Sequence, residues 1–94
     1  MSNVTLTDNE IRAIKLTLNY DNRDDQLCDN FSNAGMEEMM LEFGWSHHQV
    51  AGLMGSLEKK RMGFYDKDDE LFWLTEKGVV TIFNIIEQEQ SQAA

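Results

Sequence analysis

The fold is decided by residues 36–50, which read MEEMMLEFGWSHHQV. Met36, Met39, Met40 and Phe43 recur at helical spacing with glutamates between them, which predicts an amphipathic helix. Gly44 suits the left-handed conformation that closes a helix. Ser46 with Gln49 forms a capping box that starts another helix. A helix, a glycine turn and a capped helix in so short a stretch predict a helix-turn-helix.

The second helix of this pair is predicted over about residues 47–61. Its buried stripe consists of apolar residues at helical spacing, Val50, Leu53, Met54 and Leu57. Another side carries only small residues, Ala51, Gly52, Gly55 and Ser56. Glycine inside a helix costs about 1 kcal/mol relative to alanine, so this smooth strip needs a reason. Either a DNA or protein backbone approaches it closely, or the neighbouring helix of the same domain packs there.

Downstream of this pair the sequence predicts a hairpin and a last helix. Residues 63–66 and 71–74 are short aromatic-rich segments on either side of the charged turn 67–70, as in a β-hairpin. Thr75 is placed to cap a helix over about residues 76–90.

Upstream, Thr7 and Glu10 form a capping box for a first helix, predicted over about residues 8–21. Gln26–Asn33 fits a loop, a short helix or a short strand, and the residues do not decide between them. The expected order is therefore helix, helix, helix, hairpin, helix. This order is mainly α with a small β-hairpin, and it predicts a winged helix-turn-helix.

The length of 94 residues fits one domain, residues 1–94, with an ordered core over about 6–88. So short a chain has no room for a deep catalytic cleft with a lid. The sequence has no glycine-rich phosphate loop, nucleophile elbow or metal-ligand spacing. The lone Cys28 cannot form an intramolecular disulfide. We therefore expect no enzyme activity, no cofactor and no metal.

The longest apolar stretch, Val79–Ile86, bears on location and assembly. It is far too short to span a bilayer, and the N-terminus does not resemble a signal peptide, so we expect a cytoplasmic protein without membrane contact. The stretch is apolar nearly all round, whereas a surface helix needs one stripe. This favours a homodimer built through the first and last helices. The alternative is a last helix covered on both sides within a monomer.

The net charge of −9 repels nucleic acid at long range, yet it is unevenly distributed. Residues 46–63 carry three cations and one acid, a local +2, and the remainder carries five cations and 16 acids, or −11. The three cations are Lys59, Lys60 and Arg61. They are placed to contact phosphates, or to cap the negative end of the helix dipole.

Four motifs occur in order within about residues 36–86: Ser46-His47-His48-Gln49-Val50, Leu57-Glu58-Lys59-Lys60, Gly63, and Leu74-Thr75-Glu76-Lys77-Gly78. In these motifs the chain resembles the MarR-like winged-helix family. The resemblance implies a dimeric transcription regulator that docks its recognition helix in the major groove and its wing in the minor groove of DNA.

Two functions follow from these features. The first is a small DNA-binding transcription regulator, with double-stranded DNA as its partner. The candidate DNA-binding residues are Ser46, His47, His48, Gln49, Gly52, Ser56, Lys59, Lys60 and Arg61. The second is an acidic winged-helix module that binds protein through the smooth strip or the wing, whose turn carries three acids and no arginine. The feature that distinguishes the DNA-binding from the protein-binding function is the smooth strip, which offers few side chains able to read base edges.

Overall fold

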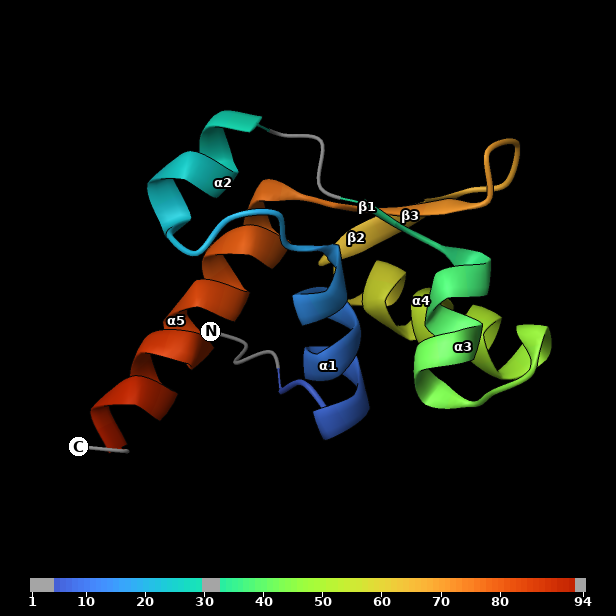
Figure 1. Cartoon of the computed structure of the whole chain (residues 1–94), viewed down its shortest axis with the longest axis horizontal. Helices are drawn as coiled ribbons and strands as arrows, with labels where there is room; N and C mark the ends of the chain where they lie inside the picture. Colours follow the sequence, from blue (N-terminus) through green and yellow to red (C-terminus); the bar gives the residue numbers. More distant parts are fainter. Residues whose placement is uncertain (1–4, 30–32, 93–94) are drawn as a thin grey trace.

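A computed structural model describes residues 5–29 and 33–92 of the chain. Within these ranges the chain is mainly α, with five helices and a small three-stranded antiparallel sheet (Figure 1). The elements in chain order are α1 (Asp8–Thr17), α2 (Arg23–Asp29), β1 (Asn33–Gly35), α3 (Met36–Phe43), α4 (His47–Lys59), β2 (Gly63–Asp66), β3 (Leu71–Leu74) and α5 (Glu76–Gln92).

The first helix begins as the sequence predicts and ends earlier. The Thr7 side chain accepts a hydrogen bond from the Glu10 amide, and Glu10 accepts one from the Thr7 amide, which forms the capping box. The predicted end near residue 21 is wrong, because α1 stops at Thr17 and the chain then becomes extended. The Gln26 side chain supplies the reason: its oxygen accepts hydrogen bonds from two backbone amides beyond the helix, those of Asn19 and Tyr20.

The stretch that the sequence left undecided contains a helix and the start of a strand. Residues 26–29 belong to α2, and Asn33 begins β1, while residues 30–32 lie outside the described part of the chain. The predicted order of elements was therefore incomplete. β1 is too short for an alternating pattern to be visible in the sequence, and it is held by antiparallel pairing with β3, far along the chain.

The α3–α4 pair forms as predicted. Gly44 closes α3 with a φ of 67°, in the left-handed region. Ser46 and Gln49 exchange the two hydrogen bonds of the capping box at the start of α4. α4 ends at Lys59 rather than near residue 61, because Arg61 itself takes a left-handed conformation with a φ of 64°.

The predicted hairpin is confirmed. β2 and β3 pair antiparallel with Gly63 opposite Leu74 and Asp66 opposite Leu71, and β1 adds to the free side of β3 to give the order β1-β3-β2. Gly63 is buried so tightly that a β-carbon there would clash with the Phe72 ring.

The core lies between the helices and one face of this sheet. Val50 and Leu57 of α4 are fully buried, as the helical stripe predicts. They join a cluster drawn from α1, α3, the sheet and α5 whose largest members include Ile14, Met36, Met39, Met54, Met62, Phe72 and Ile82. The radius of gyration of 13.0 Å is that of a compact globule of this length.

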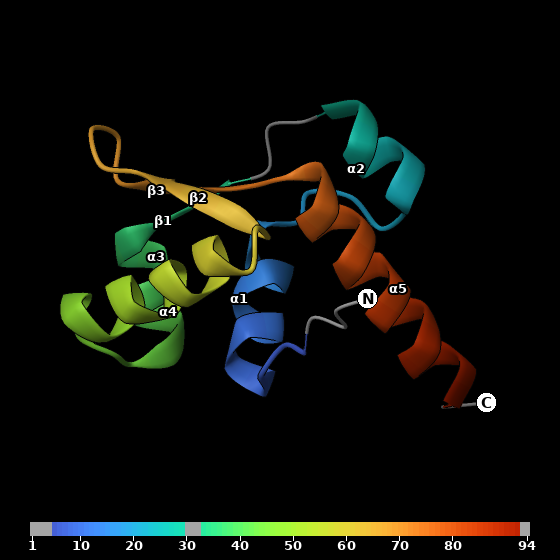
Figure 2. The same cartoon turned by 180° about the vertical axis from the view of Figure 1, so that it is seen from behind.

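α5 has neighbours on more than one side. Figures 1 and 2 both show α2 lying beside α5, and α1 also packs against it. Arg23 of α2 holds this contact by donating hydrogen bonds to the side-chain oxygens of Asn84 and Glu87, and both donor–acceptor distances are 2.8 Å. Much of the second apolar face of α5 is thus covered within the chain. In the described part of the chain, no helix has the length and apolar character needed to cross a membrane.

Candidate interaction surface

The first turn of α4 presents polar side chains to solvent. Ser46, His47, His48 and Gln49 are all exposed. Ser46 Oγ and Gln49 Oε1 are both used by the capping box, at 3.3 and 2.9 Å, so these atoms start the helix rather than face a partner. The two histidine rings and the side-chain nitrogen of Gln49 are left as the groups of this turn that are free to meet a macromolecule.

The two glycines of the smooth strip on α4 face open space, whereas Ala51 packs against the core and Ser56 against α1. Gly52 is exposed and Gly55 half-buried, and a β-carbon built on either meets no heavy atom within 4 Å. Packing within the domain therefore does not require glycine at these positions. Packing by the neighbouring helix is therefore not the reason for these two glycines, and close approach by another molecule stays a prediction.

Ser56 and Lys60, two of the predicted DNA-binding residues, face inward. Both donate to the Glu10 carboxylate of α1: Ser56 Oγ lies 2.5 Å and Lys60 Nζ 2.6 Å from its oxygens. Glu10 is 1% exposed. Burial raises its pKa, but the hydrogen bonds from Lys60, Ser56 and the Thr7 backbone, with the Lys60 charge, outweigh burial and lower the pKa. The Ser56 hydroxyl, the Lys60 ammonium group and the Glu10 carboxylate thus hold α4 against α1. Ser56 and Lys60 are therefore not free to bind a phosphate.

The remaining cations divide into two sets. Arg12, Lys15 and Arg23 form ion pairs with glutamates, as Lys60 does. Among the described residues, the cations without an ion pair are Lys59, Arg61, Lys67 and Lys77.

Three of these unpaired cations belong to the segments that meet where α5 begins against the end of α4. The Thr75 hydroxyl donates to the Arg61 carbonyl over 2.7 Å, and Gly78 packs directly on the Met62 carbonyl. Lys59, Arg61 and Lys77 come from this junction. The basic part of the predicted island is therefore at the far end of α4 from its histidines.

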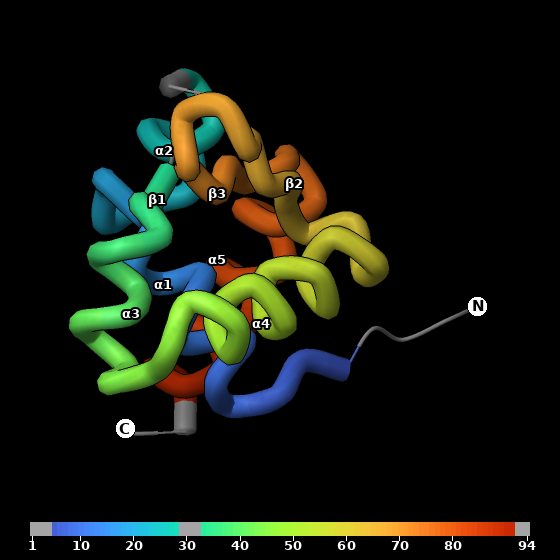
Figure 3. The backbone as a smooth tube through the Cα atoms, turned by 90° about the vertical axis from the view of Figure 1, so that its right-hand side faces the viewer, coloured from blue at the N-terminus to red at the C-terminus, as the bar shows by residue number. Residues whose placement is uncertain are grey.

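A groove separates α4 from the hairpin, and Figure 3 views the side of the molecule on which these elements lie. We call it the α4–hairpin groove; it is lined by His47, Ala51, Met54, Glu58, Tyr65, Lys67 and Glu70. Glu58 is fixed there by a hydrogen bond from the Tyr65 amide. Burial and the nearby carboxylates of Glu70 and Asp66 raise the pKa of Tyr65. Carboxylates thus set the electrostatics of the groove.

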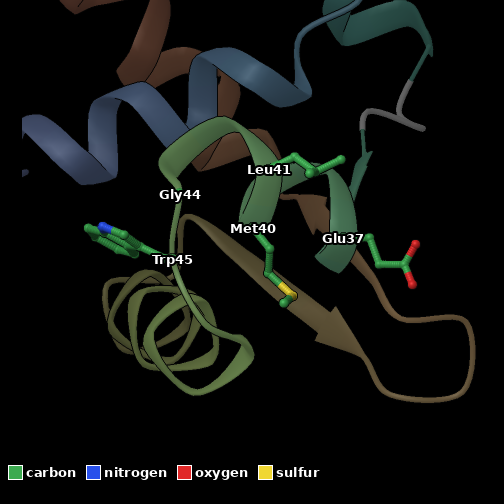
Figure 4. Close-up of a pocket in the computed structure, with 5 residues that line it drawn as sticks. All are labelled: Glu37, Met40, Leu41, Gly44 and Trp45. Carbon is green, nitrogen blue, oxygen red and sulfur yellow. The ribbon is translucent and has the colours of Figure 1, made fainter.

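A second hollow, on α3, was not predicted. The α3 hollow is lined by Glu37, Met40, Leu41, Gly44 and Trp45 (Figure 4). Leu41 is 85% exposed. The sequence assigned Met40 to the buried face and passed over Leu41. The missed signal was an apolar residue one position beyond the buried stripe, on the polar side of an amphipathic helix.

Aromatic stacking fixes the wall of the α3 hollow. The Trp45 ring stacks on Phe43 with 4.8 Å between centroids. The Arg12 guanidinium lies over the Phe43 ring at 4.5 Å and forms an ion pair with Glu42. The Trp45 amide donates to the Met40 carbonyl, which closes the turn after Gly44. The hollow is therefore formed before any partner arrives.

A third hollow connects the first two. It lies between α3 and the hairpin, is lined by Gly35, Met36, Glu37, Asp69, Glu70 and Leu71, and shares Glu37 with the α3 hollow and Glu70 with the α4–hairpin groove. We call the three together the acidic face. Its lining includes four carboxylates, Glu37, Glu58, Asp69 and Glu70, and one lysine, Lys67.

Metal chemistry finds no support in residues 5–29 and 33–92, where no three histidine, cysteine or acidic side chains gather in a group able to hold an ion. Cys28 is exposed.

Comparison of the chain with known protein families, curated proteins and solved structures found no match.

Proposed function

We propose that this chain is a winged-helix module that binds another protein through its acidic face. The order α1, β1, α3, α4, β2, β3 with the sheet order β1-β3-β2 supports the winged-helix assignment, as does the glycine-closed turn between α3 and α4. In this assignment α2 is an insertion after the first helix, α4 corresponds to the recognition helix of MarR-like proteins, and the hairpin is the wing.

The observation that carries the proposal is the charge of the acidic face. In a DNA-binding winged helix, the start of α3, the exposed side of α4 and the wing would meet phosphates. Here those elements present Glu37, Glu58 and Glu70 in adjoining hollows. Carboxylates within a Debye length of about 8–10 Å of a phosphate repel it with little screening, whereas they attract a basic protein surface.

DNA binding remains a second candidate because of the cations at the end of α4. Lys59 and Arg61 are exposed and have no ion pair among the described residues. Together with His47, His48 and the open surface at Gly52, they form the part of the predicted DNA site that is free to act. This candidate requires the phosphates to follow the C-terminal end of α4 and avoid the wing.

Titration with random and genomic duplex at about 20 mM salt separates the two functions, because electrostatic attraction is least screened there. We expect no binding. Duplex binding that weakens as salt is raised would establish the DNA function instead, if changing Lys59 and Arg61 to glutamine also reduces this salt dependence. Each phosphate contact that is lost should reduce the slope of log K against log salt concentration by about 0.9.

A paired capture experiment tests the protein function. Glu70 lines both the α4–hairpin groove and the third hollow, so Glu70→Lys reverses a charge on the acidic face and should abolish capture of a cellular partner with little change in the thermal melt. Glu76→Lys is the matched control, since it makes the same change at an exposed glutamate of α5 that lines none of the three hollows. Equal capture by wild type, Glu70→Lys and Glu76→Lys would contradict binding through the acidic face.

A further inference from the structure

The α3 hollow has an apolar centre that nothing in the described chain covers. Large exposed hydrophobic side chains among the described residues are Tyr20, Leu41 and Phe64, and Leu41 is by far the most exposed, at 85% against 41% and 50%. It lines one hollow together with Met40 and Trp45, which are half-buried, and Figure 4 shows the three side chains pointing in different directions around this hollow. A surface hollow lined by apolar side chains is a candidate binding site.

Helical spacing explains how α3 exposes this surface. Glu37, Met40, Leu41 and Gly44 are separated by three, four and seven positions from the first, so they share one side of the helix. Met36 and Met39 on the opposite side are buried in the core. α3 therefore exposes one large apolar side chain, Leu41, beside the half-buried Met40, on a side that the fold does not require to be apolar.

The charge around the hollow selects the kind of partner. α3 carries three glutamates and no basic residue in its eight positions, and Glu37 and Glu38 are both exposed in its first turn. Glu42 at the other end is neutralised by Arg12 at 3.2 Å. Glu38 accepts the capping-box hydrogen bond from the Gly35 amide, so Glu37, which lines the hollow and has no ion pair among the described residues, is the carboxylate that favours a cationic partner.

The same charge argues against a second copy of this chain. A two-fold symmetric contact places the same surface on both subunits. Two α3 hollows facing each other would bring the first-turn glutamates of both copies together around an apolar centre. Like charges in such an interface are unfavourable, so a homodimer is a poor occupant.

We propose that the α3 hollow binds a basic amphipathic helix of another protein. The apolar side chains of this partner helix contact Leu41, Met40 and Trp45, and its lysine or arginine residues face Glu37. This is the mode in which an amphipathic helix lays its apolar side into a groove. The proposal rests on the proposed function, since it names the surface and the class of partner for the same protein-binding role.

The test uses the full chain and a synthetic helical peptide of about 18 residues built from leucine and lysine, long enough to form helix. The control peptide has the same composition with its leucines scattered round the helix, so it carries equal charge without an apolar side. Backbone amide shifts should concentrate in residues 37–45. The amphipathic peptide should bind at least about tenfold tighter than its control.

Matched variants assign the binding to the hollow. Leu41→Ala should weaken the amphipathic peptide by about tenfold, whereas Phe64→Ala removes another exposed apolar side chain, on the hairpin, and should leave binding unchanged. Changing Glu37 and Glu38 to glutamine should reduce the dependence of binding on salt.

Equal affinity for the two peptides would overturn the proposal, as would shifts confined to the α4–hairpin groove. Self-association that Leu41→Ala abolishes would overturn it too, in favour of a second copy. These results are distinct from failure of the proposed function, which is decided by duplex binding and by capture with the Glu70 variant, because Glu70 does not line the α3 hollow. If the chain binds neither peptide, the proposal for the α3 hollow is wrong, but a protein-binding role elsewhere on the acidic face still stands.

Discussion

Lys60 at the end of α4 reaches the buried Glu10 of α1, with 2.6 Å between Nζ and the carboxylate. The two residues are 50 positions apart, and Glu10 also accepts from Ser56 and the Thr7 amide. A cation that the sequence places on a DNA-facing helix thus stabilises the packing of two helices. Four donated hydrogen bonds, counting the Lys60, Ser56 and Thr7 donors and the bond from Lys60 to the Thr5 carbonyl, organise this corner of the fold.

Removing the lysine should be costly near neutral pH. Lys60→Ala removes the counter-ion of Glu10, which keeps its hydrogen bonds from Ser56 and the Thr7 amide, and we expect a loss of about 1–3 kcal/mol in the free energy of unfolding. Urea unfolding at pH 7 measures it. Lys59→Ala is the matched control, since Lys59 is exposed and has no ion pair among the described residues, and it should change stability by less than about 0.5 kcal/mol.

The same pair predicts the direction of the pH dependence. The pKa of Glu10 is lowered in the folded protein, so its contribution to stability is complete above the unfolded value of about 4.3 and is lost as pH falls through the lower folded value. Glu10→Gln should therefore be less stable than wild type at pH 7, with the difference shrinking on acidification below about pH 4. A difference that stays constant from pH 7 to pH 3 would show that the charge of Glu10 does not stabilise the fold.

Two glycines in helices should respond to alanine in opposite directions. A β-carbon at Gly52 meets open space, so Gly52→Ala should stabilise the protein by about 0.5–1 kcal/mol through helix propensity. A β-carbon at Gly78 would collide with the Met62 carbonyl, so Gly78→Ala should destabilise it by about 1–3 kcal/mol. Thermal or urea melts measure the stability of the two variants. If both substitutions stabilise the protein, α5 does not begin against the loop that follows α4.

Two leucines in neighbouring helices should differ as sharply. Leu57 is fully buried where α4 meets the core, and Leu57→Ala should cost about 2–5 kcal/mol. Leu41 is 85% exposed, so Leu41→Ala should stay within about 0.5 kcal/mol of wild type. Denaturant melts compare them directly, and a loss at Leu57 below about 1 kcal/mol would mean that the buried face of α4 is another one.

Local signals account for what the sequence predicts well. Gly44, the Ser46–Gln49 capping box and the hairpin segments each rest on neighbouring residues, and the α3–α4 turn and the β2–β3 pairing follow from them. Contacts between distant residues account for what the sequence missed. α1 ends early because of Gln26, and β1 exists because β3 is available to pair with it.

The candidate site likewise has parts that the sequence predicts and parts that depend on contacts between distant residues. The exposed first turn of α4 and the open strip at Gly52 follow from position on one helix. The inward direction of Ser56 and Lys60 depends on Glu10, which no pattern within α4 reveals. The α3 hollow depends on Trp45 stacking against Phe43 after the turn, a contact that periodicity alone does not specify.

Assembly is the last property that the packing predicts. The apolar character of Val79–Ile86 favours a dimer through the first and last helices, but α2 packs against α5 and Arg23 holds it there through Asn84 and Glu87. With much of that face covered, we expect sedimentation equilibrium to give the monomer mass of 10.9 kDa at high micromolar concentration. Arg23→Ala weakens the cover and should increase self-association, with Lys15→Ala, which removes a different pairing to α5, as the control. A wild-type protein at twice the monomer mass would instead support the dimer.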